Sequence, residues 1–348
     1  MKKLLPLKYT LAFSLYIVAY LAFTLPGYWT YSLIIYGYGI IPFVELFYKP
    51  DFNNTDPISE SNIYDYLLYA MVPLHFLSLI YFFYSVNQAH LETYEIVGRI
   101  LTMGTICGHS INIAHELGHR GRKMEQNLAK TLLLGSLYMH FIIEHNRGHH
   151  KLAATLEDPA TARKGEILYF FLCRSIFYSY VSAWKLEYKR LKERKKKFLS
   201  LENEMIQFEM IQILFCVLIY YFFGLSILLY HFYVSLMGII LLESINYVEH
   251  YGLLRQKNEN GKYEKITHMH SWNANVTLGR IMLFELPRHS DHHLVASKKY
   301  QTLESHENSP ELPSGYIGMI LLSFFPPAWF WIVDPILEKI NSSNKTID

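Results

Sequence analysis

Apolar stretches long enough to cross a lipid bilayer occur in both halves of the chain. A transmembrane helix needs about 20 consecutive, mostly apolar residues. The first four stretches predict two hairpins separated by the polar segment 49–64, and the last two predict a third hairpin that turns at Gly224. We therefore expect an all-α integral membrane protein with about six spans. The expected spans cover about residues 9–25, 28–48, 66–86, 95–114, 209–224 and 226–248.

Two further apolar stretches, 131–143 and 167–184, lie between the fourth and fifth expected spans. If 131–143 crossed the bilayer by itself, His115 and His145 would lie on opposite sides of the membrane. The chemistry described below requires these two residues together. We therefore expect each stretch to form a helix that is buried at the cytoplasmic face or re-enters the membrane from it, as part of a helical cap that holds a metal site.

Composition and charge favour a multi-pass protein and predict its orientation. Of the 348 residues, 51% are hydrophobic and only 18% are charged, which is a small polar share for a soluble chain of this length. Lysine and arginine are enriched in cytoplasmic loops. Lys2, Lys3 and Lys8 precede the first span, and eight basic residues lie between Lys185 and Lys197. We therefore expect the N-terminus, the middle region and the C-terminus in the cytoplasm.

The remaining global features exclude several classes of site. The first residues resemble a secretory signal peptide, but no small-x-small cleavage site follows, so we expect them to be retained as the first span. The three cysteines form no C-x-x-C pair and therefore no rubredoxin-like or zinc-ribbon motif. A formal net charge of +2 does not indicate a strongly acidic partner, and we expect no nucleic acid to bind.

We expect a single membrane-embedded domain over residues 1–348, because the sequence shows no internal repeat and no low-complexity segment. Its expected parts are spans one to four in 1–114, a cytoplasmic histidine-rich region in 115–208, spans five and six in 209–248, and a cytoplasmic C-terminal region in 249–348.

The strongest chemical signal is a set of nine histidines in four clusters. The clusters read HELGH at 115–119, EHNRGHH at 144–150, NYVEHYG at 246–252 and RHSDHH at 288–293. Residues three or four apart in a helix share one face, so most histidines within a cluster point the same way. Nine buried imidazoles without a metal would leave many hydrogen-bonding nitrogens unpaired. We therefore predict these metal ligands: His115, His119, His145, His149, His150, His250, His289, His292 and His293.

The number of histidines indicates two metal ions. One zinc ion takes four ligands, whereas nine imidazoles match two ions that keep open positions. Imidazole binds zinc, copper, iron and nickel, so the ligand type alone leaves the metal open. A ligating histidine usually donates its second N–H to a carboxylate or a carbonyl, and each cluster has an acid beside a histidine. The candidates for accepting this second N–H are Glu116, Glu144, Glu249 and Asp291. The alternative is that these four side chains are ordinary carboxylates in contact with solvent. His270 is a candidate for lining the site.

The four clusters resemble the histidine motifs of the integral-membrane alkane monooxygenases, a family within the membrane fatty acid desaturase and hydroxylase superfamily. The family pattern is HELGHK, EHNKGHH, NYIEHYG and QRHSDHH, and this chain has HELGHR, EHNRGHH, NYVEHYG and PRHSDHH. Only Pro287 is a non-conservative departure. The flanking stretches DFNN at 51–54, DPAT at 158–161, LLRQK at 253–257 and LPSGY at 312–316 are also similar, so the resemblance covers nearly the whole chain.

The resemblance implies a site of two non-haem iron ions held by the nine histidines, on the cytoplasmic side of the bacterial inner membrane. It implies that O2 and two electrons are used to hydroxylate the terminal carbon of an alkane to a primary alcohol. The electrons come from NADH through a rubredoxin reductase and rubredoxin. Related branches act on alkyl-aromatic or fatty acyl substrates, and the NYVEHYG motif favours the alkane branch.

The resemblance also implies an apolar tunnel that receives alkanes from the bilayer. The second span lines this tunnel in the family, and a bulky residue near the position of Gly37 can close it. Glycine has no side chain to stop an alkyl tail, so we expect Gly37 to set the depth of the tunnel. The alternative is that Gly37 only permits close helix packing, as small residues in spans often do.

Other features bear on electron supply and on rival functions. Gly37 and Gly39 lie in an apolar stretch rather than a phosphate-binding loop, so we expect electrons to arrive from another protein. The basic run 185–197 has two interpretations, a docking surface for an acidic carrier and an anchor to membrane lipid headgroups. A membrane zinc protease would explain HELGH but leaves seven clustered histidines without a role. A non-enzymatic metal carrier would place its ligands nearer the membrane midplane.

Overall fold

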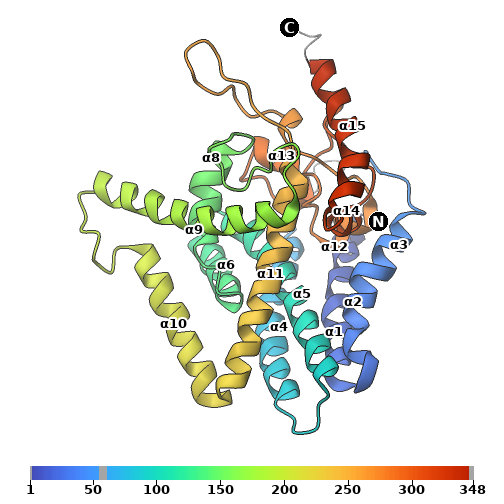
Figure 1. Ribbon diagram of the computed structural model, residues 1–348, viewed down its shortest axis with the longest axis vertical. Helices are drawn as coiled ribbons and strands as arrows, with labels where there is room; N and C mark the ends of the chain where they lie inside the picture. Colours follow the sequence, from blue (N-terminus) through green and yellow to red (C-terminus); the bar gives the residue numbers. More distant parts are fainter. Residues whose placement is uncertain (1, 55–60, 345–348) are drawn as a thin grey trace. The chain divides into compact units, whose positions relative to one another are not determined.

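A computed structural model describes residues 2–54 and 61–344, and the regular secondary structure within these ranges is helical apart from three isolated β-bridges (Figure 1). This confirms the all-α prediction. The short 3₁₀ and π segments are η1 Lys2–Phe13, η2 Gly27–Tyr31, η3 Ile35–Ile40, η4 His145–His149, η5 His268–His270 and η6 Tyr300–Thr302. The α-helices of the N-terminal half are α1 Ser14–Thr24, α2 Ser32–Ile34, α3 Ile41–Glu45, α4 Ile63–Val86, α5 Thr93–Gly118, α6 Lys123–Gly135, α7 Phe141–Glu144 and α8 His150–Leu152. Those of the C-terminal half are α9 Leu168–Glu193, α10 Glu204–Phe223, α11 Leu225–His250, α12 Thr277–Met282, α13 His289–Leu294, α14 Tyr316–Ser323 and α15 Pro326–Asn344.

Four helical stretches within the described residues are long and apolar enough to cross a membrane. They are Leu5–Thr24, α4, α10 and α11, and they correspond to four of the six expected spans. The expected span 28–48 is a broken helical run with a π-helical segment at its centre. The expected span 95–114 lies within α5, whose 26 residues are about 39 Å long at 1.5 Å per residue. The total of six spans therefore stays a prediction, whereas a multi-pass membrane protein is confirmed.

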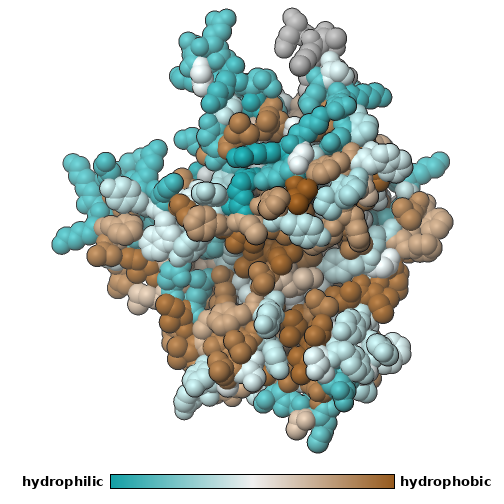
Figure 2. Space-filling view, viewed as in Figure 1, coloured by the Kyte–Doolittle hydropathy of each residue, from teal (hydrophilic) through white to brown (hydrophobic). Residues whose placement is uncertain are grey.

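The hairpin between α10 and α11 shows how local sequence determines the ends of two spans. Asn203 caps the start of α10, because its side-chain oxygen accepts hydrogen bonds from the backbone N–H groups of Met205 and Ile206 at 3.0 and 3.3 Å. Gly224 separates the two helices with a φ of 85°, a left-handed conformation that glycine adopts at little cost. Leucine, isoleucine and aromatic side chains of α10 are widely exposed, as expected of a surface in contact with lipid (Figure 2).

The described chain forms two compact units. The first unit draws on 1–40, 58–147 and 180–242, and the second draws on 41–57, 148–179 and 243–348. The single domain expected over 1–348 stays a prediction.

The first unit is built around α5, which packs against α1, α4 and α6 (Figure 1). Gly104 and Gly108 of α5 lie against Met237 and Leu241 of α11, and a β-carbon at either glycine would collide with them. Small residues four apart permit this close approach between helices that cross a membrane. The stretch 131–143, expected as one buried helix, is interrupted after α6, where Leu137 adopts a left-handed φ of 52°.

The second unit contains α3, α12, α13, α14 and α15, together with the C-terminal end of α11. Its core is aromatic. The Trp329 ring packs against Tyr247 and Tyr251, with ring centroids 5.2 and 5.3 Å apart, and all three side chains are buried. Trp272 is also buried, and its indole N–H donates to the Tyr251 carbonyl at 2.8 Å. This core supports the last residue of α11, which is one of the predicted metal ligands.

Candidate metal centre

Four of the nine predicted ligands converge in the second unit. His149 ends η4, His250 ends α11, and His289 and His293 lie one turn apart on α13. All four side chains are buried, and the ligand nitrogens lie within 4.8 Å of one another. The Nε2 atom of His289 is 2.9 Å from that of His293 and 3.3 Å from that of His250. We call these residues the four-histidine group.

The geometry of the four-histidine group fits a metal ion. A nitrogen ligand lies about 2.0–2.1 Å from a bound metal, so two nitrogens on one ion are separated by roughly 3 Å. Burial lowers the pKa of His293, and the neighbouring His289, His150, His149 and His250 rings lower the pKa further. The imidazole is therefore neutral at pH 7, which is the form that binds a metal.

The other five predicted ligands form a trio in the first unit and a pair in the second. The trio consists of His115 and His119, at the end of α5, and His145, with ring centroids 4.5 to 5.0 Å apart. The Nε2 atoms of His119 and His145 are 3.0 Å apart. The pair consists of His150 and His292, whose Nε2 atoms are 3.2 Å apart. Each predicted ligand thus has at least one other beside it.

Two carboxylates among the described residues lie against the four-histidine group, and Glu249 is the one predicted from the sequence. The Glu249 carboxylate lies 3.3 Å from His289 Nε2. Asp158, which the sequence did not single out, accepts a hydrogen bond from His149 Nδ1 at 2.9 Å. Asp158 also accepts from the Thr161 hydroxyl at 2.6 Å. Its only signal in the sequence was its place in the DPAT stretch that resembles the family.

The Asp158 carboxylate is ionised despite its burial. Burial raises the pKa of this carboxyl, but the His149 ring and the Thr161 hydroxyl outweigh that effect, and the pKa lies below its usual value. An ionised carboxylate that accepts from Nδ1 fixes the tautomer of His149, because the Nδ1 atom must then carry the proton. The Nε2 atom of His149 is left as the metal-binding nitrogen.

The contacts of the other three predicted acids, within the part of the chain that the structure describes, include groups outside the nine histidines. Glu116 forms an ion pair with Arg120, and Arg120 also lies 3.5 Å from Asp65. Glu144 accepts a hydrogen bond from the Ser182 hydroxyl at 3.3 Å. Through these contacts, Glu116 and Glu144 stabilise the part of the first unit that lies near its histidine trio.

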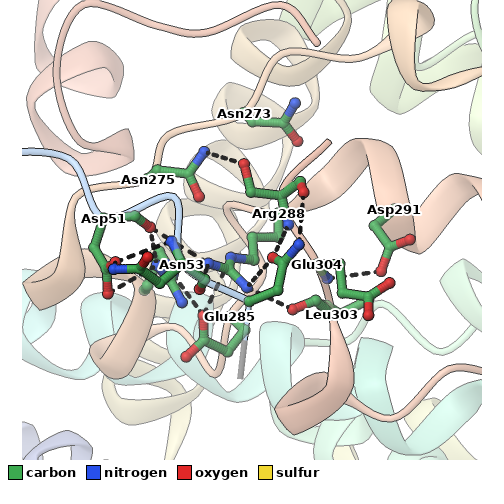
Figure 3. Close-up of polar contacts among 12 residues, drawn as sticks. Asp51, Asn53, Asn273, Asn275, Glu285, Arg288, Asp291, Leu303 and Glu304 are labelled. Carbon is green, nitrogen blue, oxygen red and sulfur yellow. Dashed lines mark hydrogen bonds and ion pairs between the residues drawn. The ribbon is translucent and has the colours of Figure 1, made fainter. Parts of the chain in front are cut away.

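Asp291, within the fourth histidine motif, holds the loop that follows α13. It accepts from the Glu304 N–H at 2.8 Å (Figure 3). It also pairs with Lys298 at 2.7 Å and with His306 at 2.8 Å. His306 in turn stacks on His268, with centroids 5.6 Å apart. Asp291 therefore fixes the chain next to the ligands.

Arg288 fixes the other end of α13. Its guanidinium is buried and donates to the Leu303 carbonyl at 2.7 Å and to the Asn53 carbonyl at 2.9 Å (Figure 3). The Asn273 side chain accepts from the Ser290 N–H at 2.9 Å. Since α13 has only six residues, these outside contacts, rather than its own hydrogen bonds, determine where His289 points.

The remaining two candidates, His270 and Gly37, have different surroundings. His270 Nδ1 accepts from the Thr267 N–H at 2.9 Å, and its Nε2 lies 3.3 Å from Glu264. Gly37 is buried in the π-helical segment η3, and a β-carbon added there would meet no described atom within 4 Å. Gly37 thus has open space beside it, although it is covered from solvent.

Comparison with known proteins identifies the class. The family model described as fatty acid desaturase matches residues 94–323, about two thirds of the chain. Over 307 residues the chain is 37% identical to "Alkane 1-monooxygenase 1" of Alcanivorax borkumensis, covering 87% of this chain and 76% of that protein. It is 37% identical over 320 residues to "Alkane 1-monooxygenase" of Pseudomonas putida, covering 90% and 79%. It is 26% identical over 243 residues to the xylene/toluene monooxygenase hydroxylase component of Pseudomonas putida, covering 70% and 64%.

The fold, the histidine groups and these matches define a membrane-bound oxidoreductase of the desaturase and hydroxylase superfamily. Within that superfamily, the chain belongs to the alkane hydroxylase family. It is a monooxygenase, a class of enzyme that uses O2 and requires a source of electrons.

Proposed function

We propose that this protein is an alkane 1-monooxygenase with two non-haem iron ions. It uses O2 to hydroxylate the terminal carbon of an alkane to a primary alcohol. The observation that carries the proposal is the convergence of four buried histidines in a chain 37% identical to proteins named alkane 1-monooxygenase. In the reaction one oxygen atom enters the alcohol and the other leaves as water, and two electrons and two protons are consumed.

We assign one iron to the four-histidine group, and the nine predicted ligands leave five for the second iron. Five imidazoles on one iron would leave one octahedral position for a reactant. The trio's His145 and the pair's His150 are five residues apart along the continuous helical backbone of η4 and α8. The second histidine motif therefore connects the two sets covalently.

The chain's own residues prepare this site for chemistry that the irons supply when bound, namely the reduction of O2 and the oxidation of a C–H bond. Asp158 holds His149 in the tautomer that presents Nε2. The buried environment of the four-histidine group excludes water from the reacting atoms. The apolar spans give an alkane dissolved in the bilayer a route that avoids water.

Two other substrate classes are alternatives to an alkane. The relative that acts on xylene and toluene supports an alkyl-aromatic substrate, but its identity of 26% is lower than that of the alkane enzymes. The match to the family model described as fatty acid desaturase supports a fatty acyl substrate through the name of that family. The family match gives no support to the zinc protease or to the metal carrier considered from the sequence.

The proposed electron donor gives a direct test. We expect purified protein, which should bind about two irons per chain, to be inactive with NADH alone. Rubredoxin and an NADH-dependent rubredoxin reductase should restore activity together and not singly. The assay measures the primary alcohol formed from an alkane under ¹⁸O2 by gas chromatography and mass spectrometry. Turnover with NADH alone would contradict the expected donor, and stoichiometric zinc without iron would contradict the proposed function. We propose that the site faces the cytoplasm and that the membrane is the bacterial inner membrane.

Gly37 gives a test of the substrate tunnel. Its buried position and the open space beside it support tunnel lining over close packing, because a packed glycine would have atoms near its missing β-carbon. We expect Gly37→Trp to lower kcat/KM for long alkanes by about tenfold or more, while short alkanes and iron content stay unchanged. Gly39→Trp is the matched control, since Gly39 also has open space but is exposed on the surface. Equal chain-length profiles for both variants and the wild type would rule out the tunnel role.

A further inference from the structure

A surface in the first unit carries a concentration of positive charge that nothing in the proposed catalysis uses. It comprises Lys185–Leu201, the C-terminal part of α9 and the turn that leads to α10, and we call it the basic tip. The basic tip contains eight lysines and arginines against two glutamates. Within the described residues, no ion pair engages six of its exposed cations: Lys185, Lys189, Lys192, Arg194, Lys195 and Lys197.

Apolar side chains lie among these cations. Phe198 is 40% exposed, Leu199 is 82% exposed and Leu201 is 68% exposed. Phe198 also contacts Trp184 and Tyr188, with ring centroids 5.8 and 5.9 Å apart. Aromatic rings of this kind are enriched at the membrane–water interface, where one edge is apolar and the other is wet. The basic tip is therefore amphipathic rather than uniformly hydrophilic (Figure 2).

The backbone holds the basic tip in a defined turn. After α9 ends, Lys195 adopts a left-handed φ of 54°, and the Lys196 N–H donates to the Leu191 carbonyl at 2.8 Å. This is the usual closing bond of a helix whose last turn ends in a left-handed residue. A left-handed backbone conformation is less favourable for lysine than for glycine. Glycine is the usual residue at this position of a helix end, whereas here the turn carries the Lys195 side chain.

Ion pairs at the base connect the basic tip to the start of a membrane span. Glu204, the first residue of α10, pairs with Lys130 at 3.1 Å and with Arg147. Arg147 also pairs at 3.0 Å with Glu187 of α9, and Glu187 pairs with Arg190. Leu201 is three residues before the span Glu204–Phe223 begins. The free cations of the basic tip are therefore held next to the bilayer surface.

We propose that the basic tip is a binding surface for the headgroups of anionic phospholipids, with Leu199 and Leu201 inserted among the acyl chains. A basic side chain near an anionic membrane surface contributes about fivefold to affinity. Amphipathic segments that combine lysines with leucine and aromatic side chains bind such surfaces in this way. The exposed leucines and the adjoining span favour a lipid over an acidic soluble carrier. The inference depends only on the membrane spans and not on the proposed reaction.

The test uses the full-length protein in neutral nanodiscs, titrated with short-chain phosphatidylglycerol at low salt. Phosphatidylcholine of the same chain length and inorganic phosphate serve as comparison probes. The test variant is Lys195→Gln with Lys197→Gln, which removes two exposed, unpaired charges. The matched control is Lys262→Gln with Lys265→Gln, which removes two exposed charges from the second unit. We expect the wild type and the control to bind phosphatidylglycerol equally, and the test variant to bind it about 30-fold more weakly.

Other outcomes would overturn the proposal. Equal binding of phosphatidylglycerol and phosphatidylcholine would show that the headgroup charge is not recognised. Binding of inorganic phosphate as strong as that of phosphatidylglycerol would point to a free-anion site. If the test variant bound phosphatidylglycerol normally but raised the KM for rubredoxin, the surface would belong to the electron carrier instead. A second variant, Leu199→Ser with Leu201→Ser, should weaken phosphatidylglycerol binding without changing any charge.

Discussion

Replacing His293 by alanine is expected to remove the metal ion from the four-histidine group and to reduce alkane hydroxylation by about 1000-fold or more. His293 is buried, and its Nε2 lies 2.9 Å from that of His289, so the substitution removes one of the four nitrogens that converge at this group. Metal affinity depends on the number of ligands, so a site with three nitrogens in place of four is expected to hold its metal less tightly. The measurements are iron per chain by elemental analysis and alcohol formed per chain.

The control for this experiment is another buried histidine. His231→Ala is suitable because His231 is fully buried, packs against Phe83 and Phe215, and belongs to none of the three histidine groups. We expect His231→Ala to lower thermal stability while iron content stays near two per chain. If His293→Ala kept two irons and full activity, the ligand assignment would be wrong. If both variants lost iron equally, the loss would reflect stability rather than coordination.

Replacing Asp158 by asparagine is expected to weaken metal binding at the same group by 10- to 100-fold. The change keeps the shape of the side chain but removes the charge that accepts from His149 Nδ1 at 2.9 Å. Partners of this kind orient the ligand and raise its basicity, and losing them typically costs that factor in metal affinity. The measurement is the rate of iron loss during dialysis against a chelator, compared with wild type.

The pH dependence of the Asp158 contact follows from its pKa, which lies below the usual value of about 3.9. A carboxyl with a depressed pKa in the folded state contributes stability that is present above its unfolded pKa and is lost as the pH falls through the folded pKa. The contact is therefore expected to be fully formed at pH 5 to 8. Metal retention by Asp158→Asn should then stay below that of wild type by a constant factor across this range.

A carboxylate elsewhere in the second unit provides the control for Asp158. Asp334 accepts from the Tyr251 hydroxyl at 2.9 Å and is not among the histidine groups. We expect Asp334→Asn to release iron at the wild-type rate. Equal rates for Asp158→Asn and wild type would show that the hydrogen bond to His149 does not support the metal.

The sequence by itself determined the features that depend on neighbours along the chain. The apolar stretches predicted α4, α10 and α11, because length and composition suffice to recognise a helix that crosses a bilayer. Gly224 predicted the turn between the last two spans, because a single residue with positive φ ends a helix. The histidine clusters predicted a metal site, because nine imidazoles cannot all be paired with one another and with water in a buried setting.

Only the tertiary structure decided how the histidines are divided. His149 and His150 are neighbours, yet His149 joins the four-histidine group and His150 pairs with His292. Adjacent side chains on a helix point about 100° apart, so the second histidine motif contributes ligands to two groups. The other ligands of each group come from distant parts of the chain. The same reason explains the acids. Asp158 supports His149 from nine residues away, whereas Asp291, beside a ligand in sequence, holds the loop at Glu304. Spacing along the chain determines the direction of a side chain, but the folding of remote segments determines what it meets.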